Sequence, residues 1–454
     1  MTTSDFWESR PVLTHVRDFA RARRVPPLAM LASLTARAIG SLDPNVVGPP
    51  VVGAHSSLNA AFALVGPSGF GKGVTEAAAR DATNLPQIPE LPLGSGEGLA
   101  RTFAVDDEGQ QEIRAAMFTA SEVDGLAAIG ARQGATVMSV FRQAISGESI
   151  GSANAQKHTR VIVPAHGYRA VFTIGVQPER AGPLINDTAG TAQRILWVPT
   201  TDPDAPAARP SEPPRWTVPR TLVPADRRTV LELPHEAVEA MDQTQLGKLH
   251  GDPDIDPLDG HALMTRAKIA AGLMVLDGRM YEVSTEDWQL AGVLMRESDR
   301  TRERIVAALS EAARRSNRAK AHAVAERDDV VAEKRVSRAA NGIVTRLQRA
   351  GRVLSHSELR KALRSDLRPE FQPAIDSLLA TGAIKSTPHG YALEGGQVDT
   401  PVHPQIRRSE GVDTLSTWTP DDARPPAKTL PGDTTDTTPG LTSRVLEIIG
   451  KAQA

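Results

Sequence analysis

Residues 60–75 read AAFALVGPSGFGKGVT, an apolar run that leads through a glycine-rich turn into an alanine-rich stretch. Six apolar residues in a row are typical of a strand buried on both faces of a sheet, and the alanines after the turn favour a helix. The G-x-x-x-x-G-K spacing matches a P-loop, in which backbone N–H groups wrap phosphates and the lysine neutralises their oxygens. The candidate nucleotide-binding residues are Gly66, Pro67, Ser68, Gly69, Phe70, Gly71, Lys72, Gly73 and Val74.

One position departs from this pattern. Gly73 stands where the motif usually has the Ser or Thr whose hydroxyl binds magnesium. Thr75 lies further into the expected helix and cannot simply replace it, so we expect Mg²⁺ to be held through water or Ser68. The alternative is a turn that binds nothing, and the flanking strand, the helix and Lys72 all disfavour it.

Further apolar runs lie on the C-terminal side of this stretch, at residues 115–120 (AAMFTA), 168–176 (YRAVFTIGV) and 194–199 (RILWVP). Short apolar runs separated by helical segments predict an α/β fold with a mostly parallel sheet covered on both faces. Residues 11–22 and 28–39 have apolar positions at helical spacing, and the proline-rich segment 199–224 indicates a linker or an extended strap. Residues 231–315 are expected to be helical.

Charged and amide side chains occur beside these runs. Glu122 and Asp124 follow the run at 115–120, Gln177 follows the run at 168–176, and Glu97 lies in the glycine-rich segment PLGSGEGLA. Arg194 immediately precedes the strand expected at 195–199. A carboxylate at a strand end can hold the hydration shell of Mg²⁺, so Glu122 and Asp124 are the candidate metal ligands, and either one can be the primary group. Each of these residues could also be an ordinary strand cap, loop carboxylate or salt-bridge partner.

The ordered set GPSGFGKG, GSGEG, FTASEVDGL, TIGVQPERAG and QRILW resembles the RecA-like helicases and ATPases of actinobacterial phages, plasmids and integrated elements. These are similar to hexameric replicative helicases and often occur beside a primase-polymerase. The resemblance covers about residues 25–300 and implies a RecA-like P-loop core that binds ATP and Mg²⁺.

The resemblance also implies roles for the catalytic candidates. Glu97 would polarise the attacking water, and Glu122 or Asp124 would be the Walker B acid. Gln177 would sense the γ-phosphate, and Arg194 would act as an arginine finger in the site of a neighbouring subunit. The sequence leaves no room for a primase-polymerase ahead of the loop, so we expect that activity to come from a separate partner, bound through the C-terminal tail.

The C-terminal part of the sequence indicates a DNA-binding appendage. Residues 296–368 carry 19 Lys or Arg against 10 Asp or Glu, and residues 335–393 predict three helices followed by two short strands, an order typical of a winged helix. Arg360, Lys361 and Arg364 are the candidate DNA contacts, although a charged helix is more often only solvated. Beyond residue 395 the chain is rich in Pro, Thr, Asp and Gly, which predicts disorder up to a short terminal helix.

The composition excludes several other classes of protein. The 454 residues contain no Cys, which removes disulfides and thiolate zinc sites and agrees with a cytoplasmic protein. No apolar stretch approaches the ~18 residues of a spanning helix, and the polar start MTTSDFWESR is unlike a secretion signal. The net charge of −2 means that any nucleic-acid surface must be local. The 11 histidines match no metal-binding spacing.

The sequence therefore predicts five parts: a helical lead-in at 1–55, a RecA-like core at 56–225, a helical domain at 226–325, a winged helix at 326–395 and a disordered tail at 396–454. The expected function is an ATP-dependent DNA helicase or translocase, a homo-oligomer with six subunits as the expected number. It would act on single-stranded or forked DNA in the replication of a mobile element, away from membranes. The alternative is an ATP-gated origin- or operator-binding initiator without unwinding activity, and a small-molecule kinase is a weaker third.

Overall fold

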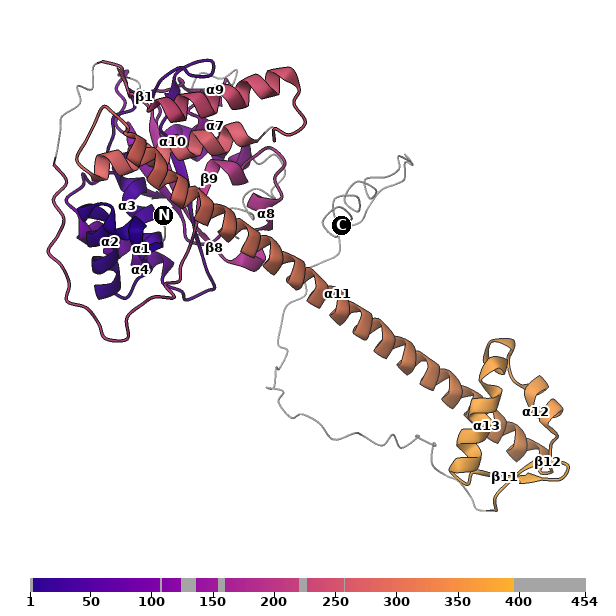
Figure 1. Ribbon diagram of the computed structural model, residues 1–454. Coiled ribbons are helices and arrows are strands. Elements are labelled where there is room, and N and C mark those ends of the chain that lie inside the picture. The colour runs from indigo at the N-terminus through magenta and orange to yellow at the C-terminus, as the bar shows by residue number, and fades with distance from the viewer. Residues whose placement is uncertain are drawn as a thin grey trace. The chain divides into compact units, whose positions relative to one another are not determined.

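The computed structural model describes residues 3–106, 108–123, 136–153, 160–219, 227–256 and 258–395. The chain forms two compact units, Met1–Arg327 and Asp328–Ala454. One helix, α11 (Thr285–Ala350), begins in the first unit and ends in the second (Figure 1). In the described ranges no helix is long and apolar enough to cross a membrane.

A five-stranded sheet, parallel throughout, forms the centre of the first unit, where the sequence predicted a mostly parallel sheet. Its spatial order is β4 (Glu90–Pro92), β5 (Ala115–Ala120), β8 (Arg169–Val176), β3 (Ala60–Val65) and β9 (Ile195–Pro199). Val65 at the end of β3 pairs with Val176 of β8 and Pro199 of β9. The carboxyl ends of these three adjacent strands therefore lie side by side.

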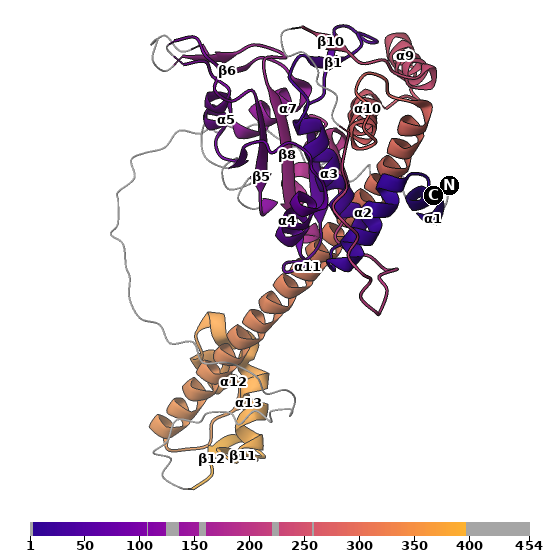
Figure 2. The same cartoon turned by 90° about the vertical axis from the view of Figure 1, so that its left-hand side faces the viewer.

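Both faces of the sheet are covered, because β3 sends alternate side chains into two separate cores. Phe62 and Leu64 pack in a cluster with side chains of α2 (Pro11–Ala22), α3 (Pro27–Gly40), α4 (Lys72–Ala82) and α10 (Asp259–Leu276). Ala63 and Val65 face α5 (Gly96–Thr102), α7 (Val137–Ser146) and α8 (Gly182–Ile185). In Figure 2, α5 lies on one side of the strands, and α3 and α2 lie on the other.

The connections that leave β3 and β8 run over opposite faces of the sheet. The chain leaves β3 through α4, whose Ala78 and Ala79 belong to the core cluster on the α3 side, and reaches β4 at the far edge. It leaves β8 through α8, whose Leu184 lies in the other cluster, and crosses to β9 on the opposite side of β3. Two adjacent parallel strands whose connections diverge in this way form a topological switch point, where open α/β sheets bind ligands.

The structure differs from the predicted division into five parts. Residues of the N-terminal lead-in and of α10 share one hydrophobic cluster with the central sheet, so these regions pack as layers of a single unit. The boundary after Arg327 lies close to the expected one at 325. The remaining elements of this unit are α1 (Thr3–Glu8), α9 (His235–His250), the small sheet β10 (Thr229–Val230), β1 (Val46–Gly48) and β2 (Ser56–Ser57), and the hairpin of β6 (Ile150–Ser152) and β7 (Val161–Val163).

The second unit contains the end of α11 with two shorter helices and a hairpin. These are α12 (His356–Ala362), α13 (Phe371–Ala380), β11 (Ile384–Thr387) and β12 (Gly390–Leu393). A capping box of Ser355 and Glu358 starts α12, and Leu354 bridges to Tyr391 of the hairpin. The first of the three predicted helices is the end of the 66-residue α11 rather than a separate helix. The predicted tail at 396–454 and its terminal helix lie outside the described residues.

Candidate functional site

The glycine-rich loop at 66–71 joins β3 to α4 at the switch point of the sheet. Gly69 and Gly71 have φ of 81° and 71°, a left-handed conformation that favours glycine. Gly71 is the N-cap of α4 and supplies no side chain to cap it. The first N–H groups of α4 are therefore available to an anion, and a helix N-terminus attracts negative charge.

The surface of this loop is open where a phosphate chain would lie. A Cβ atom built on Gly69, Gly71 or Gly73 would meet no neighbouring atom within 4 Å. Gly66, in contrast, is closely packed, because a Cβ there would lie 1.9 Å from Oγ1 of Thr200. The first glycine is thus required by packing, while the following glycines leave the cradle uncovered.

Lys72 folds over the loop that precedes it. Its Nζ donates to the carbonyl oxygens of Gly66 at 2.9 Å and Pro67 at 3.0 Å. Partial burial lowers the pKa of Lys72, while the negative charge of Glu122 acts in the opposite direction. The ammonium group therefore stays beside the cradle on weak, neutral partners that a phosphate oxygen can replace.

Glu122 and Gln177 reach the same place from two different strands. Glu122 follows β5, Gln177 follows β8, and Nε2 of Gln177 lies 3.4 Å from Oε1 of Glu122. Both side chains therefore lie at the carboxyl edge of the sheet with Lys72. The third predicted carboxylate, Asp124, lies outside the described residues.

Sequence reasoning missed Gly175, the next-to-last residue of β8. A Cβ there would lie 2.1 Å from the carbonyl oxygen of Ser121 and 3.3 Å from Cδ of Lys72. Only glycine lets the end of β5 and the lysine approach β8 this closely. The available signal was a glycine inside an otherwise apolar strand, which marks a close backbone approach.

The residues present suit a nucleotide-bound magnesium ion better than a permanent metal centre. Thr75 is fully buried and its hydroxyl donates to Gly71 at 2.8 Å, so it does not face the cradle, as its sequence position suggested. Across the residues that the structure describes, no group of three or more His, Asp or Glu could hold a metal. Mg²⁺ commonly binds through one or two carboxylates, substrate phosphates and water, which Glu122 and the exposed Ser68 permit.

Glu97 does not join this group. It lies in the first turn of α5, beside the edge strand β4, and accepts a hydrogen bond of 2.8 Å from Oγ1 of Thr136. Its own backbone N–H and that hydroxyl lower the pKa of its carboxyl group. Glu97 also lines a cavity of about 270 Å³ with Arg101 and Ser152. Two strands, β5 and β8, lie between β4 and β3, so Glu97 is separated from the loop that follows β3.

Arg194 lies at the amino ends of the strands, whereas the loop lies at their carboxyl ends. It immediately precedes β9, and the amino ends of parallel strands are remote from their carboxyl ends. Its guanidinium group donates to the carbonyl oxygens of Ala189 at 2.7 Å and Gly190 at 2.9 Å, and burial lowers its pKa. Arg194 therefore cannot reach the loop of its own chain.

The candidate DNA-binding side chains are all exposed on the second unit. Arg360 and Lys361 belong to α12, while Arg364 follows it and forms an ion pair of 3.2 Å with Asp366. Helix α13, FQPAIDSLLA, has no Lys or Arg. In the described part of this unit, the Lys and Arg side chains therefore lie outside α13, on α11 and α12, in the segments that follow each of them, and at Lys385 of β11.

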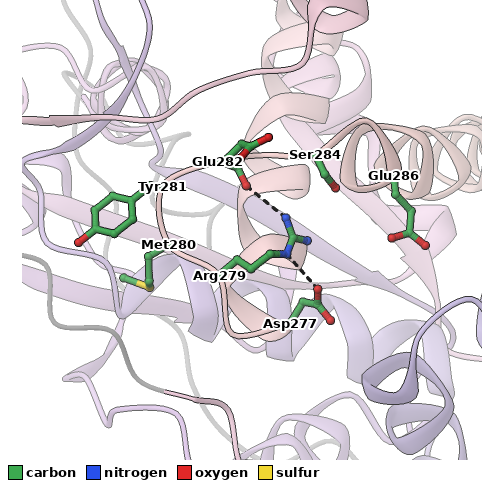
Figure 3. Close-up of a pocket in the computed structure, with 7 residues that line it drawn as sticks. All are labelled: Asp277, Arg279, Met280, Tyr281, Glu282, Ser284 and Glu286. Carbon is green, nitrogen blue, oxygen red and sulfur yellow. Dashed lines mark hydrogen bonds and ion pairs between the residues drawn. The ribbon is translucent and has the colours of Figure 1, made fainter.

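A wider hollow of about 540 Å³ lies at the turn between α10 and α11 (Figure 3). Its charged groups are largely used within the chain, since Arg279 forms ion pairs with Asp277 at 3.0 Å and Asp287 at 2.7 Å. Fully buried Asp287 also accepts a hydrogen bond of 2.6 Å from Arg10, which bonds to Glu286 as well. This ionic cluster fastens the N-terminal helices to the start of α11 and accounts for these charges structurally.

Comparison with known proteins gives no family for this chain. No model of a known protein family matches it, and no curated protein matches it in sequence. The functional proposal therefore depends on the geometry of the loop and the strand ends.

Proposed function

We propose that this chain is an ATP-hydrolysing motor with a RecA-like core that moves on DNA. The observation that carries the proposal is the convergence of Lys72, Glu122 and Gln177 at the switch point of a parallel sheet. These residues come from three segments that lie about 50 residues apart in the sequence. Each segment supplies one polar side chain to the site. A cationic lysine, a carboxylate and an amide around an open anion cradle are the groups that phosphoryl transfer uses.

Each residue has a distinct task in this proposal. The open amides of the loop and α4 bind the phosphate chain, and Lys72 exchanges its two carbonyl partners for phosphate oxygens. Glu122 holds the water shell of Mg²⁺, and that ion, when bound with ATP, neutralises charge on the phosphates. Gln177, through its contact with Glu122, couples β8 to the presence of the terminal phosphate.

Glu122 is the carboxylate, among the described residues, whose charge acts on Lys72, so we assign it the principal acidic role. Glu122→Gln should abolish ATP turnover while nucleotide binding persists, because the carboxylate acts mainly on the reacting groups. The role of Glu97 in polarising water stays a prediction, and Glu97→Gln tests it directly as the matched carboxyl-to-amide change. Equal loss of turnover in both variants would contradict the ranking of Glu122 above Glu97.

The first test of the proposal is Lys72→Ala, with the exposed Lys320→Ala as the matched control. We expect ATP turnover to fall roughly a hundredfold or more in Lys72→Ala, as for other lost charge-stabilising donors, and to stay unchanged in the control. Far-UV circular dichroism should show that both variants are folded. Unchanged turnover in folded Lys72→Ala would remove the basis of the assignment.

Arg194 would have a catalytic role if the motor forms a ring. It lies at the amino ends of the strands and cannot reach the loop of its own chain. In a head-to-tail ring it would complete a neighbour's site. Arg194→Ala and Lys72→Ala should each lose turnover, and mixing the two should restore part of it, since some interfaces then combine an intact loop with an intact arginine. No recovery on mixing would argue against the finger.

An ATP-gated DNA-binding protein is the second candidate, favoured by the compact second unit with exposed Arg360 and Lys361. Under this alternative its three helices and hairpin would act as a winged helix that recognises an origin or operator. Strand displacement from a forked duplex with ATP and Mg²⁺ supports the motor. Sequence-selective duplex binding that survives without hydrolysis, with no strand displacement, supports the alternative.

A further inference from the structure

A further cavity, of about 190 Å³, is lined in part by Thr200, which packs against the glycine-rich loop. It lies between the turn that joins α2 to α3 and the segment that follows β9. The residues that form its walls include Arg21, Arg24, Val25, Pro26, Thr200 and Asp202. None of these was singled out in the sequence, because no local motif contains them.

Thr200 connects this cavity to the loop. Its backbone N–H donates to the carbonyl oxygen of Val65 at 2.8 Å, directly before the first glycine of the loop. Its hydroxyl oxygen occupies the place that a Cβ of Gly66 would need. The cavity therefore begins where the phosphate cradle begins, at the same edge of the sheet.

The walls of the cavity combine flat cationic, apolar and polar groups. The guanidinium group of Arg21 is fixed by two hydrogen bonds to Asp202, of 2.9 and 3.1 Å. Val25 and Pro26 supply apolar surface next to it. A fixed guanidinium plane stacks on aromatic rings, and an apolar pocket with a few oriented polar groups is typical of small-ligand sites.

Another wall residue, Arg24, is held in a strained conformation. Arg24 has φ of 55°, a left-handed conformation that is uncommon for a residue other than glycine. Its guanidinium group donates to the carbonyl oxygens of Pro206 at 2.5 Å and Ala207 at 2.8 Å. These bonds hold the proline-rich strap against the turn after α2, and they thereby fix the shape of the cavity. Strain that is maintained by surrounding contacts is often found at binding sites.

We propose that this cavity holds the heteroaromatic base of the nucleoside triphosphate whose phosphates lie in the loop at 66–71. The inference rests on the proposed nucleotide-binding function and adds the subsite that distinguishes a nucleotide from a bare polyphosphate. The base stacks on the plane of Arg21 and the apolar surface of Val25 and Pro26, while Asp202 and Thr200 face its polar edge. The strap that contains Pro206 is then part of the nucleotide site rather than a passive linker.

The test compares ATP with tripolyphosphate, which has the same number of phosphates and no base, by isothermal titration calorimetry on the full chain with Mg²⁺. Ala205→Trp fills the cavity from an exposed position on its wall. Arg24→Gly removes the guanidinium group while keeping the left-handed backbone that glycine favours. Arg17→Ala, on α2 and ion-paired to Asp18 away from the cavity, is the matched control.

We expect the wild type to bind ATP more tightly than tripolyphosphate. Ala205→Trp and Arg24→Gly should each weaken ATP binding roughly tenfold, which one lost stacking or wall contact explains, and change tripolyphosphate binding less than about twofold. Equal affinity for the two ligands in the wild type, or ATP binding that neither variant changes, would overturn the inference alone. Binding of neither ATP nor tripolyphosphate by the wild type would overturn the proposed function and this inference with it.

Discussion

Lys268 gives the most quantitative prediction, because it is a fully buried lysine without a carboxylate partner among the interactions described for it. It lies on α10 with 5% of its surface exposed, and its Nζ donates to the carbonyl oxygen of Ile145 at 2.8 Å. Burial, and then the charges of Arg169 and Arg194, lower the pKa of Lys268 to about 7. A charged ammonium group is therefore unfavourable in the folded chain.

The free-energy cost follows from the two pKa values. The gap between the ordinary value of 10.5 and about 7 amounts to about 5 kcal/mol at about 1.4 kcal/mol per pH unit. The unfolded chain binds this proton more tightly, so unfolding takes up a proton between pH 7 and 10.5, and stability rises with pH in that window. The penalty is complete below pH 7 and has fallen to about 2 kcal/mol at pH 9.

Lys268→Met should remove this penalty and leave the carbonyl group of Ile145 without its partner, at a pH-independent cost of about 1–2 kcal/mol. The variant should therefore be more stable than the wild type by about 3–4 kcal/mol at pH 6 and nearly equal to it at pH 9. Denaturant unfolding followed by tryptophan fluorescence measures this. Tryptophans that report on the unit are Trp7, Trp197, Trp216 and Trp288.

The control is Lys320→Met, which changes an exposed lysine in the same unit and should leave the difference from wild type small at every pH. A stability difference for Lys268→Met that does not change between pH 6 and pH 9 would refute the reasoning. Such a result would mean that the buried ammonium group finds compensation in the folded chain.

Three further predictions concern single residues. Gly175→Ala should lower ATP turnover at least tenfold in a folded protein, because its Cβ would displace Ser121 and with it Glu122, and wild-type kinetics would contradict this close approach. Gly73→Ser should be accommodated, since a Cβ there meets nothing within 4 Å, and its hydroxyl should lower the Mg²⁺ concentration that gives half-maximal turnover; an unchanged Mg²⁺ dependence would count against the metal position. Ser355→Ala should destabilise α12 by about 1 kcal/mol through loss of the capping box, seen as faster hydrogen exchange at residues 356–362, and unaltered exchange would show that the cap is dispensable.

The candidate site was predictable where one short segment contains the information. The loop from Gly66 to Lys72 and the strand before it follow from local spacing and from an unbroken apolar run. The positions of Glu122 and Gln177 were also predictable, because Gln177 directly follows an apolar strand and Glu122 lies two residues beyond the end of another. Glu97 and Arg194 were chosen by the same local reasoning, and the fold places one beside an edge strand and the other at the opposite edge of the sheet.

The sequence alone predicted the strands β3, β5, β8 and β9 and the glycine-rich turn after β3, because these depend on near neighbours along the chain. It did not predict the short edge strand β4, which has no comparable apolar run. Only the tertiary structure decided that β8 lies between β5 and β3, and therefore which polar residues meet Lys72. It also decided that Arg24 is strained, that Gly175 contacts Ser121, and that Lys268 of α10 is buried with its Nζ on the carbonyl oxygen of Ile145. Strand order and burial arise from pairing between residues far apart in sequence, and no local pattern contains that choice.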